Sequence, residues 1–442
     1  MRRPLVILLA AALVASGRPA LGAPSLSALD VIALEVCYTT VLARYYRAVD
    51  PVVLLGGART GIVAYLRSRG VTEPMVPLAP AHADKYAAEN AIDSDVALTM
   101  VRYGNRVVTA DLVRSTIAGE LATLDDPYSV VFPPRAYKQF VGFLDGRPVG
   151  GIGAELDVDP QTHAVRIVDV FADAPAARAG LQPGDVITAI NGAPPPVGTP
   201  GAVEAALRGA PGSSLQLTVQ RDGIAQPPIT LVRRTIVPPD VTGRRLADGI
   251  GYVRLRSFGA QSPQQLDAVL KTLRGARAYV LDLRADGGGY RDAAVAIAGR
   301  FVHGVVVTTQ ERGVPAQTFR APDVPALGAP LAVLVDGDTA SAAEIVAGAI
   351  QDAHAGTLVG TRTFGKGLVQ ETFPLPDGGA IKLTTARYRT PAGRDIEGVG
   401  ITPDLVVAEP SDAHVGEPGA DPQLDASVAV LRAKRSTDSS AP

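Results

Sequence analysis

A chain of 442 residues is long enough for roughly two to four domains, and its composition, 47% hydrophobic and 19% charged, is typical of globular proteins. The 42 Lys and Arg residues nearly balance the 44 Asp and Glu residues, so net charge gives no general attraction to nucleic acid or to an anionic membrane. Cys37 is the only cysteine, which excludes an intramolecular disulfide and any metal site built from several thiolates.

Residues 1–23 predict a secretory signal peptide. Arg2 and Arg3 precede an apolar run, Leu5 to Ala15, and small and turn-forming residues follow. A membrane-spanning helix needs about 20 apolar residues, so export with cleavage is favoured over a permanent anchor. We expect a mature protein that works in the periplasm or another extracytoplasmic compartment, with membrane association as the alternative. ATP and dinucleotides are scarce there, so we expect no cofactor.

Residues 24–145 predict a helical region, because most of their apolar residues have helical spacing. One such run contains Leu29, Ala33, Val36 and Cys37. Since no histidine is near Cys37 in the sequence to activate it, Cys37 is interpreted as a core residue and not as a nucleophile.

Residues 146–238 predict a small, mostly β domain, because short β-branched runs alternate with Gly and Pro turns. The segment from Ala174 to Gly192, APAARAGLQPGDVITAING, resembles the signature of PDZ domains. The resemblance implies that a peptide adds as a strand beside residues 152–156, with a helix at 202–208 as the other wall. The peptide carboxylate would bind the backbone amides of Gly151, Ile152 and Gly153, and an apolar last residue is expected.

Residues 239–407 predict an α/β core. After two prolines, strands alternate with helices, which indicates βαβ units around a largely buried parallel sheet. The expected strands are 251–255, 278–284, 332–336 and 357–360, and the expected helices are 263–273, 291–301 and 341–352. Residues 408–442 predict a linker, a short helix and a mobile tail. The chain is therefore expected to be an α+β multidomain protein.

Ser341 is the first candidate catalytic residue. It follows a predicted strand and begins a predicted helix, and Glu344 stands three residues later. Taken alone, this pattern predicts a capping box, in which the two side chains bond free N–H groups of the first turn. A serine at a strand-to-helix turn is also well placed as an exposed nucleophile, because the first-turn N–H groups and the helix dipole can stabilise an oxyanion.

Lys366 is the candidate base that would decide between these interpretations. It lies in an apolar, Gly-rich turn, where burial would lower its pKa and let a neutral amine accept the Ser341 proton. Residues 360–366 also match the start of a P-loop, but Gly367 stands where Ser or Thr would bind magnesium, and a strand is predicted next. His354 is an alternative base, close in sequence to the Ser341 helix. The histidines lack metal-ligand spacing, so no metal is expected.

A third segment, Asp282 to Gly289, reads DLRADGGG and predicts a strand that opens into a glycine turn. It is either a tight βα turn or the source of a second oxyanion donor, the backbone N–H of Gly288, facing the N–H of Ala342. The segment lacks the G-x-G-x-x-G pattern of a dinucleotide-binding turn.

Together these segments resemble the carboxyl-terminal processing peptidases, also called tail-specific proteases. The resemblance extends from about Leu124 to Val407, and the 25-residue interval between Ser341 and Lys366 matches the interval in the family. The motifs that carry it are Leu124-Asp125 with Pro127-Tyr128-Ser129, the PDZ segment, DLR at 282–284 with its glycines, SAAEI at 341–345, FGKG at 364–367 with Gln370, and YRTPAGR at 388–394.

The resemblance implies a crotonase/Clp-protease-like core in which Ser341 is the nucleophile and Lys366 the general base. It further implies that Gln370 orients the lysine amine, that Asp352 supports the site, and that the helical region mediates homo-oligomerisation or adaptor binding. The function expected is an exported serine endopeptidase that captures C-terminal tails of proteins and cleaves them through an acyl-enzyme. The alternative is a catalytically inactive, PDZ-containing peptide-binding protein on the same fold.

Three residues depart from the family pattern. Thr339 and Ala343 stand where serine is common, and neither is the expected nucleophile. Asp286 stands where asparagine is common, beside the expected oxyanion donors. A charged carboxylate there would oppose a developing oxyanion unless it is paired, for example with Arg284 or Arg291.

Overall fold

The computed structural model describes residues 26–77, 84–158, 162–171, 173–196, 200–322, 327–410 and 415–438. The predicted signal peptide lies outside these residues, as do His82 and His414. The described chain forms two compact units. The first contains the residues up to Tyr137 together with Gln370–Thr384, and the second contains Lys138–Val369 and the residues from Thr385 onward.

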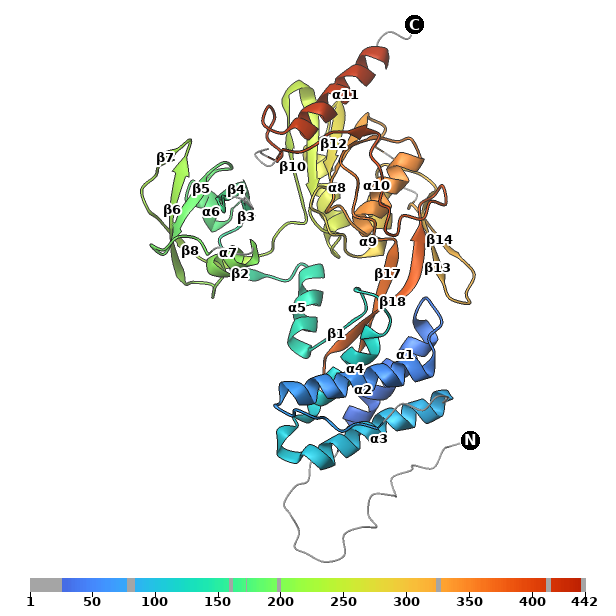
Figure 1. Ribbon diagram of the computed structural model, residues 1–442. Coiled ribbons are helices and arrows are strands. Elements are labelled where there is room, and N and C mark those ends of the chain that lie inside the picture. The colour runs from blue at the N-terminus through green and yellow to red at the C-terminus, as the bar shows by residue number, and fades with distance from the viewer. Residues whose placement is uncertain are drawn as a thin grey trace, which may run out of the picture. The chain divides into compact units, whose positions relative to one another are not determined.

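Four long helices dominate the described part of the first unit: α1 (Ala28–Arg44), α2 (Pro51–Ser68), α3 (Lys85–Tyr103) and α4 (Thr109–Ala122), which lie side by side (Figure 1). Asp50 caps α2 by accepting the N–H of Val52, and Pro51 occupies the first helical position. Cys37 is fully buried in the core between these helices, and burial raises the pKa of its thiol, as expected for an inert core residue. A short strand, β1 (Val130–Phe132), pairs antiparallel with residues 380–382.

The PDZ-like part of the second unit is a β-sheet with the strand order β3-β4-β5-β6-β7, in which β8 also pairs with β6. β3 is at one end of this order and follows directly on the turn containing Gly153. The elements are β2 (Val149–Gly151), β3 (Ala154–Val158), β4 (Val165–Val170), α6 (Pro175–Arg178), β5 (Val186–Ile190), α7 (Pro200–Leu207), β6 (Ser214–Arg221), β7 (Ile224–Ala225), β8 (Ile229–Val232) and β9 (Arg234–Ile236).

The core of the second unit is a mixed sheet of order β10-β11-β12-β15-β16-β19. Only β10 is antiparallel to its neighbour, and the other described pairings are parallel, as the alternation of strands and helices predicts. The elements are β10 (Val241–Arg245), β11 (Ile250–Leu255), α8 (Ser262–Thr272), β12 (Ala278–Asp282), α9 (Arg291–Ala298), β15 (Leu331–Val335), α10 (Ala342–Asp352), β16 (Thr357–Gly360) and β19 (Leu405–Val406). Outside this sheet lie α5 (Pro134–Leu144), β13 (Val305–Glu311), β14 (Gln317–Arg320), β17 (Leu368–Pro374) and β18 (Ala380–Arg389).

Alternate residues of the central strands pack against helices on the two faces of this sheet. On one face, Leu281 and Val333 contact a core that includes residues of α8, α9 and α10. On the other face, Val280 and Leu334 contact Leu424 and Leu431 of α11 (Pro422–Asp438). Because β12 and β15 are parallel neighbours, the turns that follow them meet at the same edge of the sheet.

Two predicted ranges are too long. The strand expected at 278–284 ends at Asp282, because the backbone and side chain of Arg284 turn back to donate hydrogen bonds to the Asp282 carboxylate. The helix expected at 291–301 ends at Ala298, where Gly299 provides the C-cap.

Candidate active site

Ser341 lies in a tight turn between β15 and α10. The Asp336 carboxylate organises this turn by accepting hydrogen bonds from the N–H groups of Asp338 (3.0 Å) and Thr339 (2.8 Å). Ser341 has φ 57° and ψ −113°, a conformation that is strained for a residue with a side chain and that the surrounding contacts must hold in place. A strained strand-to-helix turn of this kind exposes the nucleophile in serine hydrolases.

The carboxylate of Glu344 binds both candidate catalytic turns. It is fully buried, and its Oε2 atom accepts hydrogen bonds from the backbone N–H groups of Ser341 (2.9 Å) and Lys366 (2.9 Å). Its Oε1 atom accepts from the N–H of Gly365 (2.8 Å) and from the hydroxyl of Thr363 (2.6 Å). The sequence predicts Glu344 only as a capping partner of Ser341. The signal for its second role is that Glu344 is the one polar residue in the apolar stretch 342–350, where a buried glutamate needs several hydrogen-bond partners.

The turn that carries Lys366 is fixed by further backbone contacts. The N–H of Phe364 donates to the carbonyl oxygen of Thr339 (3.0 Å), and the N–H of Gly367 donates to the Glu397 carboxylate (2.6 Å). Lys366 is partly buried and is followed by β17, a strand. The helix that a P-loop requires is therefore missing after Lys366, and the P-loop interpretation is excluded.

His354 lies far from Ser341. It is exposed and follows the last residues of α10, whereas Ser341 precedes the first residue of that helix. A helix of 11 residues is about 16 Å long. His354 is therefore out of reach as a base for Ser341.

The glycine turn after β12 lies directly against the Ser341 turn. A Cβ atom on Gly288 would stand 2.8 Å from the backbone nitrogen of Ala342 and 2.9 Å from the Cβ of Ser341, so only glycine fits there. The N–H of Ala340 donates to the carbonyl oxygen of Asp286 (2.9 Å), which ties the two turns together. The structure thus brings Ser341, Ala342 and Gly288 to one place.

Asp286 is buried within this turn. Its Oδ1 atom accepts a hydrogen bond from the N–H of Gly288 (2.8 Å), and its Oδ2 atom has no hydrogen-bond partner in the described part of the chain. Burial raises the pKa of Asp286 well above its usual range, and the negative charges of Asp240 and Asp336 add to this effect. Burial therefore favours the protonated form of Asp286, and its Oδ2 atom is hydrogen-bonded neither to Arg284 nor to Arg291, the partners that the sequence suggests.

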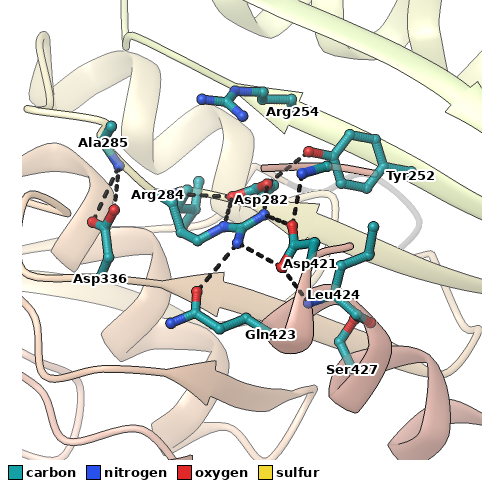
Figure 2. Close-up of polar contacts among 12 residues, drawn as sticks. Tyr252, Arg254, Asp282, Arg284, Ala285, Asp336, Asp421, Gln423, Leu424 and Ser427 are labelled. Atoms are coloured by element: carbon teal, nitrogen blue, oxygen red, sulfur yellow. Dashed lines mark hydrogen bonds and ion pairs between the residues drawn. The ribbon is translucent and has the colours of Figure 1, made fainter. Parts of the chain in front are cut away.

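A buried ionic network supports the start of the glycine turn (Figure 2). Arg284 donates to both Asp282 (2.7 Å) and Asp421 (2.7 Å), and all three side chains are almost completely buried. Although burial alone would raise it, the pKa of Asp282 is held below its usual range by the Arg284 charge. The next residue, Ala285, donates its N–H to both carboxylate oxygens of Asp336 (3.1 and 3.0 Å). Asp421, at the start of α11, had no predicted role.

Two further predicted residues have partners outside the Ser341 and Lys366 turns. The Asp352 carboxylate, at the end of α10, accepts the N–H of Ala392 (2.7 Å) and pairs with Arg394. Asp352 therefore supports the loop that contains these two residues. Gln370 belongs to the first unit, where its Nε2 atom donates to the hydroxyl of Thr384 (3.2 Å).

The predicted carboxylate-binding segment lies directly before β3, the strand at one end of the PDZ-like sheet. The carbonyl oxygen of Ile152 accepts the N–H of Ala176 (2.9 Å), and that of Gly153 accepts the N–H of Phe171 (2.9 Å). Gly151 pairs with Arg234 between β2 and β9. These contacts fix the backbone of all three residues directly before β3.

Two further features, a metal site and a membrane-spanning helix, concern the described residues. No group of three or more His, Cys, Asp or Glu residues in those ranges is arranged to hold a metal ion. Among the same residues, no helix is both long and apolar enough to cross a membrane.

Comparison with known proteins finds two family models that match this chain. The model of peptidase family S41 matches residues 249–407, and a PDZ-domain model matches residues 166–221. A carboxyl-terminal-processing protease of Synechocystis is 37% identical over 321 residues, which cover 70% of this chain and 75% of that protein. A carboxy-terminal-processing protease of Bartonella bacilliformis is 35% identical over 315 residues, covering 68% of this chain and 70% of that protein.

A solved structure from Bacteroides fragilis, named as an S41 protease, shares the fold. It aligns with 90% of this chain and 97% of its own length at a TM-score of 0.59 and 17% identity. The fold, the Ser341 turn and these matches define a serine peptidase that carries a PDZ domain. The chain belongs to peptidase family S41, and the relatives described above are carboxyl-terminal processing proteases.

Proposed function

We propose that this protein is an exported endopeptidase that recognises unstructured C-terminal tails of proteins through its PDZ domain and cleaves them with a Ser341–Lys366 dyad. The dyad is supported by one observation above all. The backbone N–H groups of Ser341 and Lys366 bind the same oxygen of Glu344, which holds the two turns next to each other. Family membership supports the same pairing, because the interval between the two residues matches that of the family.

The proposed reaction needs neither metal nor cofactor. The neutral amine of Lys366 accepts the hydroxyl proton of Ser341 while Oγ attacks the carbonyl carbon of the scissile bond. The N–H groups of Ala342 and Gly288 stabilise the oxyanion that forms, and the C–N bond then breaks as the Lys366 ammonium returns the proton to the leaving amine. A water molecule, deprotonated by Lys366, releases the acyl group from Ser341. Gln370 is assigned to orient the Lys366 amine.

Tail recognition is supported by the place of β3 at the end of the PDZ-like sheet. A terminal strand offers backbone groups to which an extended peptide can add, and the amides of Gly151, Ile152 and Gly153 would bind its carboxylate. Export to the periplasm or another extracytoplasmic compartment rests on the pattern of residues 1–23. Oligomerisation or adaptor binding through residues 24–145, and a crotonase/Clp-protease-like core at 239–407, complete the proposal.

The proposal is tested with the mature protein and its Ser341→Ala and Lys366→Ala variants. Each is incubated with two unstructured reporters, one ending in apolar and one in charged residues, and the products are analysed by intact mass. We expect fragments only from the apolar-tailed reporter and only with the unmodified protein. Full cleavage by Lys366→Ala would refute the dyad, and equal cleavage of both reporters would refute tail recognition. Binding without cleavage by the unmodified protein would favour a peptide-binding protein.

A further inference from the structure

One proposed oxyanion donor already donates a hydrogen bond to another group of the protein. The N–H of Gly288, which lies against Ser341 and Ala342, donates to Oδ1 of Asp286 at 2.8 Å. Asp286 is completely buried, and its second carboxyl oxygen lacks a hydrogen-bond partner among the described residues. Leaving a charged oxygen buried without a partner is costly, so this geometry favours the protonated carboxyl group.

Charged groups face Asp286 from three elements. Asp240 precedes β10 and Asp336 follows β15, and both negative charges oppose ionisation of Asp286. Arg254, on β11, favours ionisation, as does the hydrogen bond from Gly288. These opposing effects are smaller than that of burial, so the carboxyl group keeps its proton well into the range in which free aspartate is ionised.

We propose that Asp286 is a positioning residue that occupies the Gly288 N–H in the resting enzyme and releases it to the oxyanion only while the carboxyl group is protonated. This inference rests on the proposed function, because it takes Ser341 as the nucleophile and Gly288 as an oxyanion donor. A neutral carboxyl oxygen is a weaker acceptor than an oxyanion, so the N–H can change partner as the oxyanion forms. An ionised Asp286 would retain the N–H and repel the oxyanion, and both effects slow acylation.

The consequence is a limit on activity at alkaline pH. Cleavage by a lysine base becomes faster with rising pH until the lysine has lost its proton. Ionisation of Asp286 acts in the opposite direction, and each pH unit above its pKa lowers the rate about tenfold. The profile of kcat against pH is therefore bell-shaped. The fall of kcat at alkaline pH, its alkaline limb, is caused by ionisation of Asp286.

The test compares the mature protein with its Asp286→Asn variant. Both cleave an unstructured peptide with an apolar C-terminus, and kcat and KM are measured between about pH 5 and about pH 10. Asparagine keeps an Oδ1 acceptor for Gly288 but cannot ionise. We expect kcat of the unmodified protein to fall about tenfold per pH unit in the alkaline limb, and kcat of the variant to stay level. Unfolding temperatures at each pH show whether both proteins remain folded. The same limb in both proteins, or no limb in the unmodified protein, overturns the proposal.

A second variant covers the case in which Asp286→Asn does not fold. In Asp240→Asn, a negative charge that faces Asp286 is removed while an acceptor for the Ser262 hydroxyl is kept. The pKa of Asp286 then falls, so the alkaline limb moves to lower pH, and an unmoved limb counts against Asp286.

Ser341→Ala separates the two proposals. Cleavage that survives this change refutes the proposed function, whereas Ser341-dependent cleavage with an unchanged limb refutes only the role of Asp286.

Discussion

Four hydrogen bonds converge on the Glu344 carboxylate, and two of them come from the residues proposed to react, Ser341 and Lys366. In a Glu344→Gln variant an NH₂ group replaces one acceptor oxygen and faces the N–H groups that the carboxylate binds. An unsatisfied buried donor costs about 1–3 kcal/mol, so we expect kcat to fall by about tenfold to hundredfold with little change in KM. Steady-state cleavage of a tail peptide measures both constants.

Thr363→Ser is the matched control for this prediction. It keeps the hydroxyl that donates to Oε1 of Glu344, so its kcat should stay close to that of the unmodified protein. A Glu344→Gln variant with unchanged kcat would show that the shared carboxylate does not position the dyad.

Gly288 gives a second prediction at this scale. In Gly288→Ala the new methyl group meets the backbone nitrogen of Ala342 at 2.8 Å, and alanine is strained at a φ of 96°. The turn must move away from Ser341, so we expect kcat to fall about hundredfold or more, as when an oxyanion donor is lost. Gly287→Ala is the control, because a Cβ there meets no atom within 4 Å. Equal losses in the two variants would contradict the prediction.

Single residues also show how far the site could be predicted from the sequence. Ser341 and Lys366 could be proposed as nucleophile and base because such residues have characteristic types, spacing and flanking glycines. The link from Glu344 to Lys366 and the raised pKa of Asp286 could not be predicted, since both depend on burial that only the folded chain creates.

At the scale of elements, the crossing of α2 and α4 is unusually close. A Cβ on Gly61 would stand 2.0 Å from the carbonyl oxygen of Ser115, and a Cβ on Gly119 would stand 2.2 Å from that of Gly57. The two helix backbones therefore touch, and no larger side chain fits between them.

The prediction is that Gly61→Ala destabilises the protein. Alanine is the better helix former by about 1 kcal/mol, but the overpacked crossing costs about 1–3 kcal/mol and the helices must separate. Gly56→Ala, on the same helix, meets no atom within 4 Å, so it should be neutral or stabilising. Thermal unfolding of the full chain measures both variants. Gly61→Ala that unfolds at or above the temperature of Gly56→Ala would contradict this.

The helices and strands could largely be predicted from the sequence, whereas the contacts between distant elements could not. Apolar spacing at Leu424 and Leu431 predicts the helix near the C-terminus, and both residues are buried against the sheet. The salt bridge that joins Asp421 to Arg284 spans 137 residues of sequence, and no local pattern indicates a pairing over that distance. Periodicity reports which face of an element is apolar but not what covers it.

At the scale of the whole molecule, the net charge is nearly balanced, but the first unit contains two carboxyl groups, Glu120 and Asp93, whose pKa values are raised by burial. Glu120, on α4, is fully buried, and neither of its carboxyl oxygens has a hydrogen-bond partner among the described residues. Burial raises the pKa of Glu120 well above its usual range, and the nearby charge of Asp93 adds to this. Burial, with the charges of Glu35 and Glu89, raises the pKa of Asp93 to about 7. Both carboxyl groups therefore keep their protons to a higher pH in the folded chain than in the unfolded chain.

This difference makes the stability of the first unit depend on pH. Because both folded pKa values exceed the unfolded ones, the two carboxyl groups contribute fully below about pH 4, and their contribution is lost as the pH rises through about 7 and beyond. We expect the unfolding temperature to fall over this range. In Glu120→Gln, which stays neutral, the fall should be smaller and the protein more stable at alkaline pH. Glu73→Gln, at an exposed position, is the control and should leave the slope unchanged. A Glu120→Gln variant with the same slope as the unmodified protein would mean that Glu120 stays ionised inside the fold.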